Sequence, residues 1–249
     1  MTLLATLQRA FDRGQALKII SGLTNFDADR VARTVKAAHL GGATFVDIAA
    51  DAELVRLAKS ITDLPVCVSA VEPDKFVPAV EAGADLLEIG NYDAFYAQGR
   101  RFEAPEVLQL TQETRTLFPE ITLSVTVPHI LALDEQVRLA EALVEAGADI
   151  IQTEGGTSSQ PAHAGTLGLI EKAAPTLAAA AEISRALSVP VLCASGLSSV
   201  TAPMAVAAGA AGIGVGSAVN RLESDLEAIA AVRALSESLA SVSRDRLSV

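Results

Sequence analysis

A nine-residue phrase occurs twice in the 249-residue chain, as AGADLLEIG at 82–90 and AGADIIQTE at 146–154. Weaker copies stand at 41–49 (GGATFVDIA) and 208–216 (AGAAGIGVG). In each copy, a glycine suited to a helix C-terminus precedes a short apolar run that is typical of a buried strand. The repeat therefore predicts four helix-to-strand units built on one plan.

A second series of apolar runs lies between the four copies. The eight predicted strands are 16–22, 44–49, 64–70, 85–90, 120–126, 149–154, 189–196 and 212–216. Amphipathic helices are predicted at 27–40, 51–60, 73–81, 104–117, 134–146, 176–187, 199–208 and 222–241.

Eight buried parallel strands that alternate with eight helices close into a (β/α)₈ TIM barrel. We expect one α/β barrel domain over residues 1–249, with an extra N-terminal helix across its bottom. A doubly wound open sheet is the alternative. Two features argue against an open sheet: the regular spacing of the strand–helix units along the sequence, and the lack of GxGxxG after the first strand.

Composition narrows the class of protein and of partner. Half of the residues are hydrophobic, which excludes general disorder, and no apolar run approaches the roughly 20 residues of a membrane helix. The net charge of −11 argues against nucleic acid or an anionic membrane as partner. Cys67 and Cys193 both lie in strand-like runs without zinc-ligand spacing, so we expect a reducing, cytoplasmic location.

Two long loops are predicted at the carboxyl ends of the strands, where barrel active sites lie. The loop at 90–103 holds both tyrosines of the chain, and the loop at 154–175 is rich in Gly, Ser and Thr. Such loops are usually lids or binding loops. They could instead be packing flaps or contacts of a homo-oligomer, since exposed aromatic residues also mark interfaces.

The stretch CASGLSSVTAPMAVAAGAAGIGVGSAVNRL contains two strand ends rich in glycine. Glycine lets the backbone approach an anion closely, and barrels commonly hold a phosphate between the loops after strands seven and eight. A short helical turn, SAVN, can follow the second strand end. The alternative is that these glycines serve only tight turns.

The same stretch closely resembles the phosphate-binding barrel superfamily, in which ASG followed by GVGSA cradles a phosphate on main-chain groups. The resemblance implies that Gly196, Gly216 and Ser217 carry the contacts, with Ser195 nearby. The chain departs from the pattern at Leu197, where the superfamily often has a second glycine, and this puts one amide contact in doubt.

Over its whole length, the chain is similar to a family first catalogued as a hypothetical plastid reading frame, the twenty-third Ycf frame, of cyanobacteria and chloroplasts. The resemblance implies a single barrel in the cytoplasm of a photosynthetic cell, or in the plastid stroma of a plant or algal relative. It brings no established reaction. The segments that carry it are ALKIISGLTNFD (16–27), ATFVDIAAD (43–51), PVCVSAVEP (65–73), LEIGNYDAFY (87–96), SVTVPHIL (124–131) and IQTEGGTSS (151–159).

Alignment of the four copies places Asp47, Glu88, Gln152 and Gly214 at the same step of alternate strands. Equal steps on alternate strands share one layer of a barrel, so three polar side chains would meet inside it. An unpaired buried carboxylate is costly, and Lys18 in the first strand is the expected cation. Gln152 in place of a third carboxylate would limit the repulsion. The alternative is a buried ion network that only stabilises the barrel.

From this layer we take Lys18, Asp47 and Glu88 as candidate catalytic residues. A metal site is not predicted, because no His pair has ligand spacing and two carboxylates make a weak case for Mg²⁺. Further rim candidates include Ser124 and His129, although a lone histidine is as readily idle. The candidate substrate-binding residues are Ser69, Asn91, Thr126, Gln152 and Glu154.

A lysine among carboxylates suits Schiff-base or proton-transfer chemistry, or serves as an electrostatic clamp. We therefore expect an enzyme of lyase, aldolase or isomerase type that acts on a small phosphorylated metabolite, without a cofactor. One alternative is an FMN-dependent oxidoreductase with the FMN phosphate at the same loops. Another is a non-catalytic sensor that binds a phosphorylated metabolite.

Overall fold

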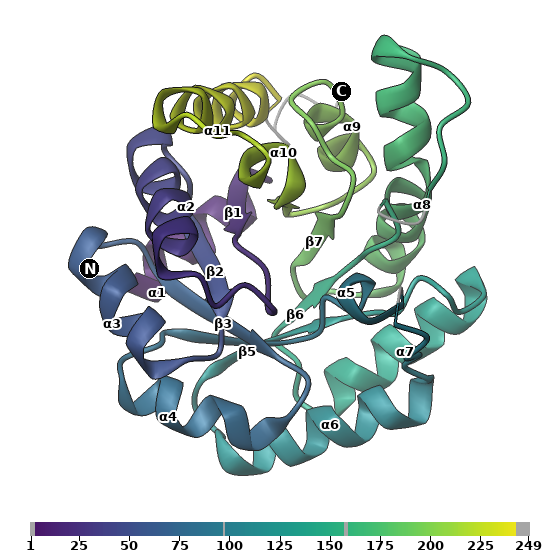
Figure 1. Cartoon of the computed structure of the whole chain (residues 1–249). Helices are drawn as coiled ribbons and strands as arrows, with labels where there is room; N and C mark the ends of the chain where they lie inside the picture. The colour runs from purple at the N-terminus through teal and green to yellow at the C-terminus, as the bar shows by residue number, and fades with distance from the viewer. Residues whose placement is uncertain (1–2, 97, 157–158, 243–249) are drawn as a thin grey trace.

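The computed structural model describes residues 3–96, 98–156 and 159–242, and its eight parallel strands form a closed barrel in chain order (Figure 1). The predicted TIM-barrel fold is confirmed. The strands are β1 (Ala16–Ile20), β2 (Phe45–Ala49), β3 (Val66–Ala70), β4 (Leu86–Ile89), β5 (Thr122–Thr126), β6 (Ile150–Gln152), β7 (Val191–Ala194) and β8 (Gly212–Val215).

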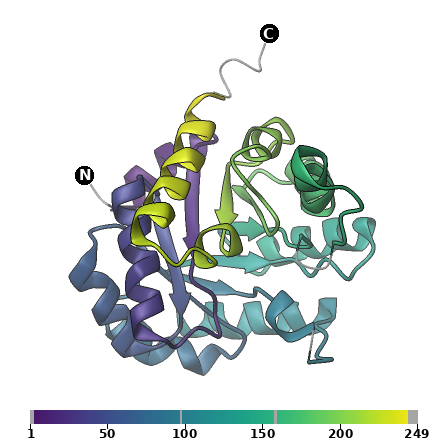
Figure 2. The ribbon, with the colours of Figure 1, turned by 45° about the horizontal axis from the view of Figure 1, so that its top comes forward.

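Helices surround the strands as an outer layer, and α11 lies beside α2 in both views (Figures 1 and 2). None of the helices in the described ranges is long and apolar enough to cross a membrane. The helices are α1 (Leu3–Asp12), α2 (Ala28–Gly41), α3 (Ala52–Ile61), the 3₁₀ helix η1 (Pro73–Lys75), α4 (Phe76–Glu81), α5 (Asp93–Tyr96), α6 (Ala104–Leu117), α7 (Leu133–Glu145), α8 (Gly165–Ala186), α9 (Ala202–Ala207), α10 (Ser217–Asn220) and α11 (Asp225–Ala240).

The repeated phrase is the joint between a helix and the next strand. Its glycine has a left-handed φ in every copy: 86° at Gly42, 105° at Gly83, 102° at Gly147 and 101° at Gly209. The alanine that follows donates its N–H to the carbonyl five residues earlier, at 2.9–3.1 Å in all four copies. This bond caps a free carbonyl of the helix C-terminus and turns the chain into the strand. The predicted helix stops are confirmed.

The strand register produces the predicted layer of Asp47, Glu88, Gln152 and Gly214. Each residue of the layer pairs with a residue of the next strand, which in turn pairs with a residue of the strand after that. This last residue lies two positions before the next residue of the layer. Four such offsets match the stagger of eight residues of a TIM barrel. The pairing runs Asp47–Cys67–Leu86, Glu88–Ser124–Ile150, Gln152–Leu192–Gly212 and Gly214–Lys18–Phe45.

The amino-terminal end of the barrel is closed by α1, as predicted. Leu7 and Phe11 of this helix pack on an apolar lumen cluster that includes Phe45, Leu86 and Ile150. The rings of Phe11 and Phe45 meet edge to face, with centroids 6.4 Å apart. The interior is thus apolar at the bottom and polar above.

Two predicted features are wrong in detail. Helix α8 begins at Gly165 rather than at 176, so much of the predicted loop at 154–175 is helical and Pro175 lies inside the helix. A proline there costs a hydrogen bond, which the buried face of the 22-residue helix offsets. The loop at 90–103 contains the short helix α5, and its Tyr92 and Phe102 are buried, which agrees better with the alternative of a packing flap than with a subunit contact through these two rings. Three residues of these two segments, 97, 157 and 158, lie outside the described ranges.

Candidate functional site

A cavity of about 330 Å³ opens at the carboxyl ends of the strands, the face at which barrel active sites lie. The loops that follow β1, β4, β6, β7 and β8 form its walls. The predicted site residues that line it are Asn91, Gln152, Glu154, Ser195, Gly196, Gly216 and Ser217. Residues from the two separate predicted groups, phosphate and substrate contacts, thus share one cavity.

The two glycines of the predicted phosphate site differ in how much room a side chain would have at each position. At Gly196, which has φ +75°, a Cβ atom would lie 2.8 Å from Cα of Gly156, so packing alone demands glycine there. At Gly216, a Cβ would lie 3.2 Å from the carbonyl oxygen of Ile20, a tight but less severe approach. The side chain of Leu197, where the sequence departs from the superfamily, is buried in the apolar core.

Two wall residues hold an unfavourable backbone conformation. Asn91 (φ 70°) and Ser195 (φ 74°) are the non-glycine residues with positive φ within the described ranges, and both line this cavity. The left-handed region costs about 1–2 kcal/mol for a residue such as serine, whereas asparagine adopts it more readily. Such strain gathers at functional sites, where the surrounding structure maintains it. The backbone thus marks the same cavity independently of any side-chain chemistry.

Beneath the cavity, Lys18 is the centre of a buried polar network. Its ammonium group forms an ion pair with Glu88, lies 3.6 Å from Asp47 Oδ2 and donates to Gln152 Oε1 at 3.1 Å. Gln152 in turn donates from Nε2 to Glu88 Oε1 at 2.7 Å. Ser69 donates to Asp47 Oδ1 at 2.5 Å. The three residues predicted as catalytic therefore do face one another inside the barrel.

The exchange of glutamate for glutamine between the two phrases has a clear electrostatic effect here. The Gln152 amide accepts from the cation and donates to the carboxylate, which a second glutamate could not do while ionised. Burial lowers the pKa of Lys18, but the charges of Asp47 and Glu88 outweigh it and raise that pKa above its ordinary value. Burial raises the pKa of Asp47 to about 6, with Lys18 opposing the shift.

The residues of this network differ in whether they line the cavity. The side chains of Lys18, Asp47 and Glu88 are fully buried, and none of the three lines the cavity. Gln152 is the member that reaches it. Of the predicted substrate contacts, Thr126 accepts from Gln152 Nε2 at 3.1 Å within the network. Thr126 and Ser69 do not line this cavity, and their contact with substrate stays a prediction.

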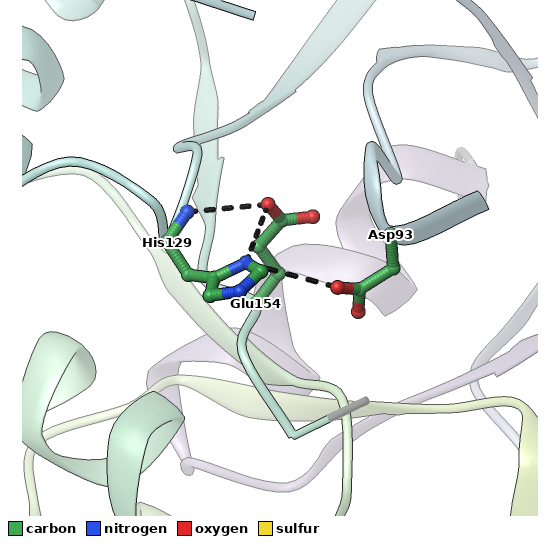
Figure 3. Close-up of side chains that lie close together, drawn as sticks. All are labelled: Asp93, His129 and Glu154. Carbon is green, nitrogen blue, oxygen red and sulfur yellow. Dashed lines mark hydrogen bonds and ion pairs between the residues drawn. The ribbon is translucent and has the colours of Figure 1, made fainter. Parts of the chain in front are cut away.

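A second polar cluster, formed by Asp93, His129 and Glu154, lies at the mouth of the barrel (Figure 3). Glu154 Oε1 lies 3.0 Å from His129 Nδ1 and accepts from the Tyr96 hydroxyl at 2.6 Å. The backbone N–H groups of Tyr92 and His129 also donate to the carboxylate of Glu154, both at 3.2 Å. Glu154 is thus the anchor that fixes the imidazole ring of His129.

Asp93 completes the cluster at the same ring nitrogen that Glu154 contacts (Figure 3). Its Oδ1 atom lies 3.7 Å from His129 Nδ1, and its Oδ2 accepts from the Ser195 hydroxyl at 3.0 Å. Oδ1 is buried and has no hydrogen-bond partner among the described residues. Asp93 and Glu154 both line the cavity, so one buried carboxylate oxygen with spare acceptor capacity belongs to a wall residue.

Electrostatics make this cluster suited to holding and moving a proton. Burial raises the pKa of Glu154, while the hydrogen bond from His129 opposes that rise. Burial lowers the pKa of His129, but its hydrogen bond with Glu154 and the nearby carboxylate charges outweigh this and raise it above 6.5. An imidazolium between two carboxylates therefore persists at higher pH than a free histidine would.

The three groups could also ligate a metal ion, because one ligand atom from each lies within 4.8 Å of the others. Glu154 already accepts four hydrogen bonds, so the cluster also has a complete description without an ion. Sequence reasoning missed Asp93. Its signal is faint: it stands two residues after Asn91 in the loop that follows β4, and only the short helix α5 turns it toward His129.

Comparison with known proteins gives a family and a fold. The model of a family described as "Protein of unknown function (DUF561)" matches residues 3–245. "Uncharacterized protein ycf23" of Porphyra purpurea is 41% identical over 223 residues, which cover 90% of this chain and 84% of that protein.

Two solved barrels share the fold over nearly the whole chain. The GGGPS of Thermoplasma volcanium matches with a TM-score of 0.68 at 14% identity, covering 98% of this chain and 99% of that one. The (S)-3-O-geranylgeranylglyceryl phosphate synthase of Thermoplasma acidophilum, solved with its substrate sn-glycerol-1-phosphate, matches with a TM-score of 0.62 at 16% identity, covering 97% and 99%.

Proposed function

The chain belongs to the DUF561 family together with the ycf23 proteins, as its sequence resemblance predicted, and we propose that it is an enzyme acting on a small phosphorylated metabolite. The reaction is proton transfer of isomerase or lyase type. One observation carries the proposal: Asp93 and Glu154 line the same cavity as Gly196, Gly216 and Ser217. A phosphate group and a reacting carbon of one small molecule can therefore be held together.

Phosphate binding is assigned to the wall formed by Ser195, Gly196, Gly216 and Ser217. Main-chain amides of this wall would provide contacts, and Arg221, which lines the same cavity, would add a cation. This suits a protein with a net charge of −11, since local dipoles can bind an anion against an unfavourable overall field. The cavity volume is at the small end of the range for small-molecule sites.

Proton transfer is assigned to Asp93, with His129 and Glu154 as its support. The carboxylate of Asp93 takes a proton from a substrate C–H or O–H group and returns it at a later step. The imidazolium of His129, 3.7 Å from Oδ1, stabilises the ionised carboxylate between these steps. Glu154 keeps the imidazole oriented by its 3.0 Å contact at Nδ1.

Lys18 acts as an electrostatic clamp in this proposal rather than as a Schiff-base nucleophile. An attacking amine must be neutral and must reach the substrate, whereas Lys18 has a raised pKa and a fully buried side chain. Its effect reaches the cavity through Gln152, whose amide it holds at 3.1 Å. Asp47 and Glu88 belong to the same clamp, so the candidate catalytic set of the sequence becomes a positioning set.

The test begins with ligands that co-purify with the protein, identified by mass spectrometry, and with calorimetric binding of sn-glycerol-1-phosphate. Gly216→Val should weaken binding of the phosphate ester at least tenfold. Ala218→Val is the matched control, because Ala218 is exposed in the same short helix and does not line the cavity. Equal affinity for both variants would remove the phosphate assignment.

Proton transfer is tested separately, by deuterium incorporation from D₂O into the co-purifying metabolite. Asp93→Asn should retain binding and lose exchange, since an amide cannot accept the proton. Borohydride with phosphorylated aldehydes and ketones should leave no adduct at Lys18. Exchange that survives in Asp93→Asn would overturn the role of Asp93. A yellow purified protein would instead favour the FMN-dependent alternative, and binding without any turnover would favour the sensor.

A further inference from the structure

A second cavity, of about 460 Å³, lies at the same end of the barrel, beside the loops that follow β1, β2 and β3. Most of its accessible wall is apolar, with Leu23, Phe26 and Val71 among the residues. The polar residues Asp51, Ser69, Glu72 and Lys75 also line it. The first cavity also has apolar wall residues, such as Ile20, Leu197 and Val215, but it contains the glycine-rich strand ends as well. We call the second one the apolar cavity.

The two cavities are neighbours that share a wall. Leu23 and Thr24, in the loop after β1, line both of them. Phe95 lies on α5, two residues after Asp93, and its ring packs on Phe102 with centroids 5.5 Å apart. For a ligand whose phosphate lies near Gly216 and whose reacting carbon lies near Asp93, the way into the apolar cavity leads past Leu23.

Phe26 is the most exposed aromatic residue that lines the apolar cavity, with 62% of its surface exposed. Its position is set by a well-bonded loop. Asn25 donates to Ser21 Oγ at 2.9 Å, and Asp27 accepts from the backbone N–H groups of Asp29 and Arg30 as the N-cap of α2. An aromatic side chain on a backbone held in this way, at the rim of an apolar cavity, supplies contact area at a low cost in backbone ordering on binding.

A third cavity also adjoins the first, and it is lined by Arg30, Arg33 and Arg221. Two of these cations already have partners. Arg30 lies 3.6 Å from Asp27, and Arg33 lies 3.3 Å from Asp225. Arg221 lines the first cavity as well, where its guanidinium can contact the phosphate itself, so the apolar cavity is the better guide to the rest of the ligand.

We propose that the substrate is a phosphomonoester carrying an apolar alkyl or aromatic group, and that this group occupies the apolar cavity. The inference rests on the proposed function, because the phosphate cavity sets the position of the head group. It adds that specificity comes from the loops after β1, β2 and β3. Apolar contact there tightens binding by about fourfold for each buried methylene.

The experiment compares three ligands by calorimetry: sn-glycerol-1-phosphate, hexyl phosphate and phenyl phosphate. Hexyl and phenyl phosphate should bind at least tenfold more tightly than the glycerol ester. Phe26→Ala should abolish most of this gain and leave the affinity for the glycerol ester unchanged. Ala52→Phe, which fills the apolar cavity from α3, should do the same. Leu226→Ala removes an exposed leucine from another surface and should change neither affinity.

Each outcome separates the two proposals. Binding of the glycerol ester with no gain from hexyl or phenyl groups would overturn the apolar cavity as a substrate site and leave the phosphate site intact. Failure of all three esters to bind would overturn the phosphate site, and this inference with it. A homodimer that dissociates in Phe26→Ala while the ester affinities stay constant would assign the exposed ring to a subunit contact, and would also overturn the inference.

Discussion

The single exchange between Glu88 and Gln152 shows how one residue can set the charge of a barrel interior. Lys18 carries one positive charge, and Asp47 and Glu88 can carry two negative charges around it. A third carboxylate at 152 would add negative charge to the buried layer that no cation among the described residues offsets. The glutamine retains both hydrogen bonds, to Lys18 and to Glu88, without adding charge.

Removing the central cation should therefore be far more costly than removing a surface lysine. Lys18→Met keeps the volume but leaves two buried carboxylates unpaired, so we expect a loss of about 3–5 kcal/mol in the free energy of unfolding. Urea unfolding measures it. Lys36→Met is the control, because Lys36 is half exposed and its 2.9 Å pair with Asp225 should contribute about 0–1 kcal/mol. Similar losses in both variants would mean that the buried network is not ionised.

The raised pKa of Asp47 makes a signed prediction about pH. Its pKa rises on folding from 3.8 to about 6, so the folded chain binds this proton more tightly than the unfolded chain. The contribution of Asp47 to stability is complete below pH 4 and declines as the pH rises through 6. Compared with Asp47→Asn, the native chain should lose about 2 kcal/mol of unfolding free energy between pH 4 and pH 7.

Unfolding measured at several pH values in both chains gives this difference directly. A native chain that instead gains stability against Asp47→Asn over the same range would show a pKa lowered on folding. That result would mean that the attraction of Lys18 outweighs burial at this site.

At the scale of elements, the two ends of the barrel have different roles, one in stability and the other in ligand binding. Helix α1 closes the amino-terminal end with apolar side chains, while the loops at the opposite end carry the cavities. Stability and ligand binding should therefore respond to different substitutions. This separation is the usual one in TIM barrels, where the carboxyl ends of the strands bear function.

Phe11→Ala tests this separation. Phe11 is almost fully buried against Phe45, so its truncation should cost about 3–5 kcal/mol of unfolding free energy. Affinity for sn-glycerol-1-phosphate, measured where the variant is folded, should not change. Phe26→Ala is the matched control, because its exposed ring should cost less than about 0.5 kcal/mol. A loss of ester affinity in Phe11→Ala would show that the bottom of the barrel is linked to the cavity.

At the scale of the whole molecule, closure depends on the last strand. β8 pairs with β7 and also with β1, so the two ends of the chain meet in one sheet. α11 then covers this junction beside α2 (Figure 2). Without β8, two strand edges would be left with unpaired backbone groups next to exposed apolar faces.

A chain that ends at Ala208 should accordingly fail to fold as a unit, although it keeps seven of the eight strands. We expect no cooperative urea transition by circular dichroism, together with aggregation during purification. The full chain is the reference. A cooperative transition at the midpoint of the full chain would contradict the view that closure is required for the remaining seven strands to be stable.

The sequence by itself determined the barrel and the buried layer, because both are periodic. Each Gly-Ala joint ends a helix by a local hydrogen bond, and equal spacing from that joint fixes which residue of each strand faces inward. For this reason, the sequence alone predicted that Lys18, Asp47, Glu88 and Gln152 meet inside the barrel. The predicted wall from Ser195 to Ser217 followed from the position of two glycine-rich strand ends.

Only the tertiary structure decided which of these residues a ligand can reach. Burial is a property of all neighbours at once, and it separates Lys18 from the cavity although strand spacing places it in the lumen. The Asp93–His129–Glu154 cluster and the apolar cavity are built by loops that have no period. Their geometry depends on α5 and on packing between residues far apart in the chain, such as the 3.0 Å contact of Asp93 with Ser195. Long-range packing of this kind leaves no local signal in the sequence.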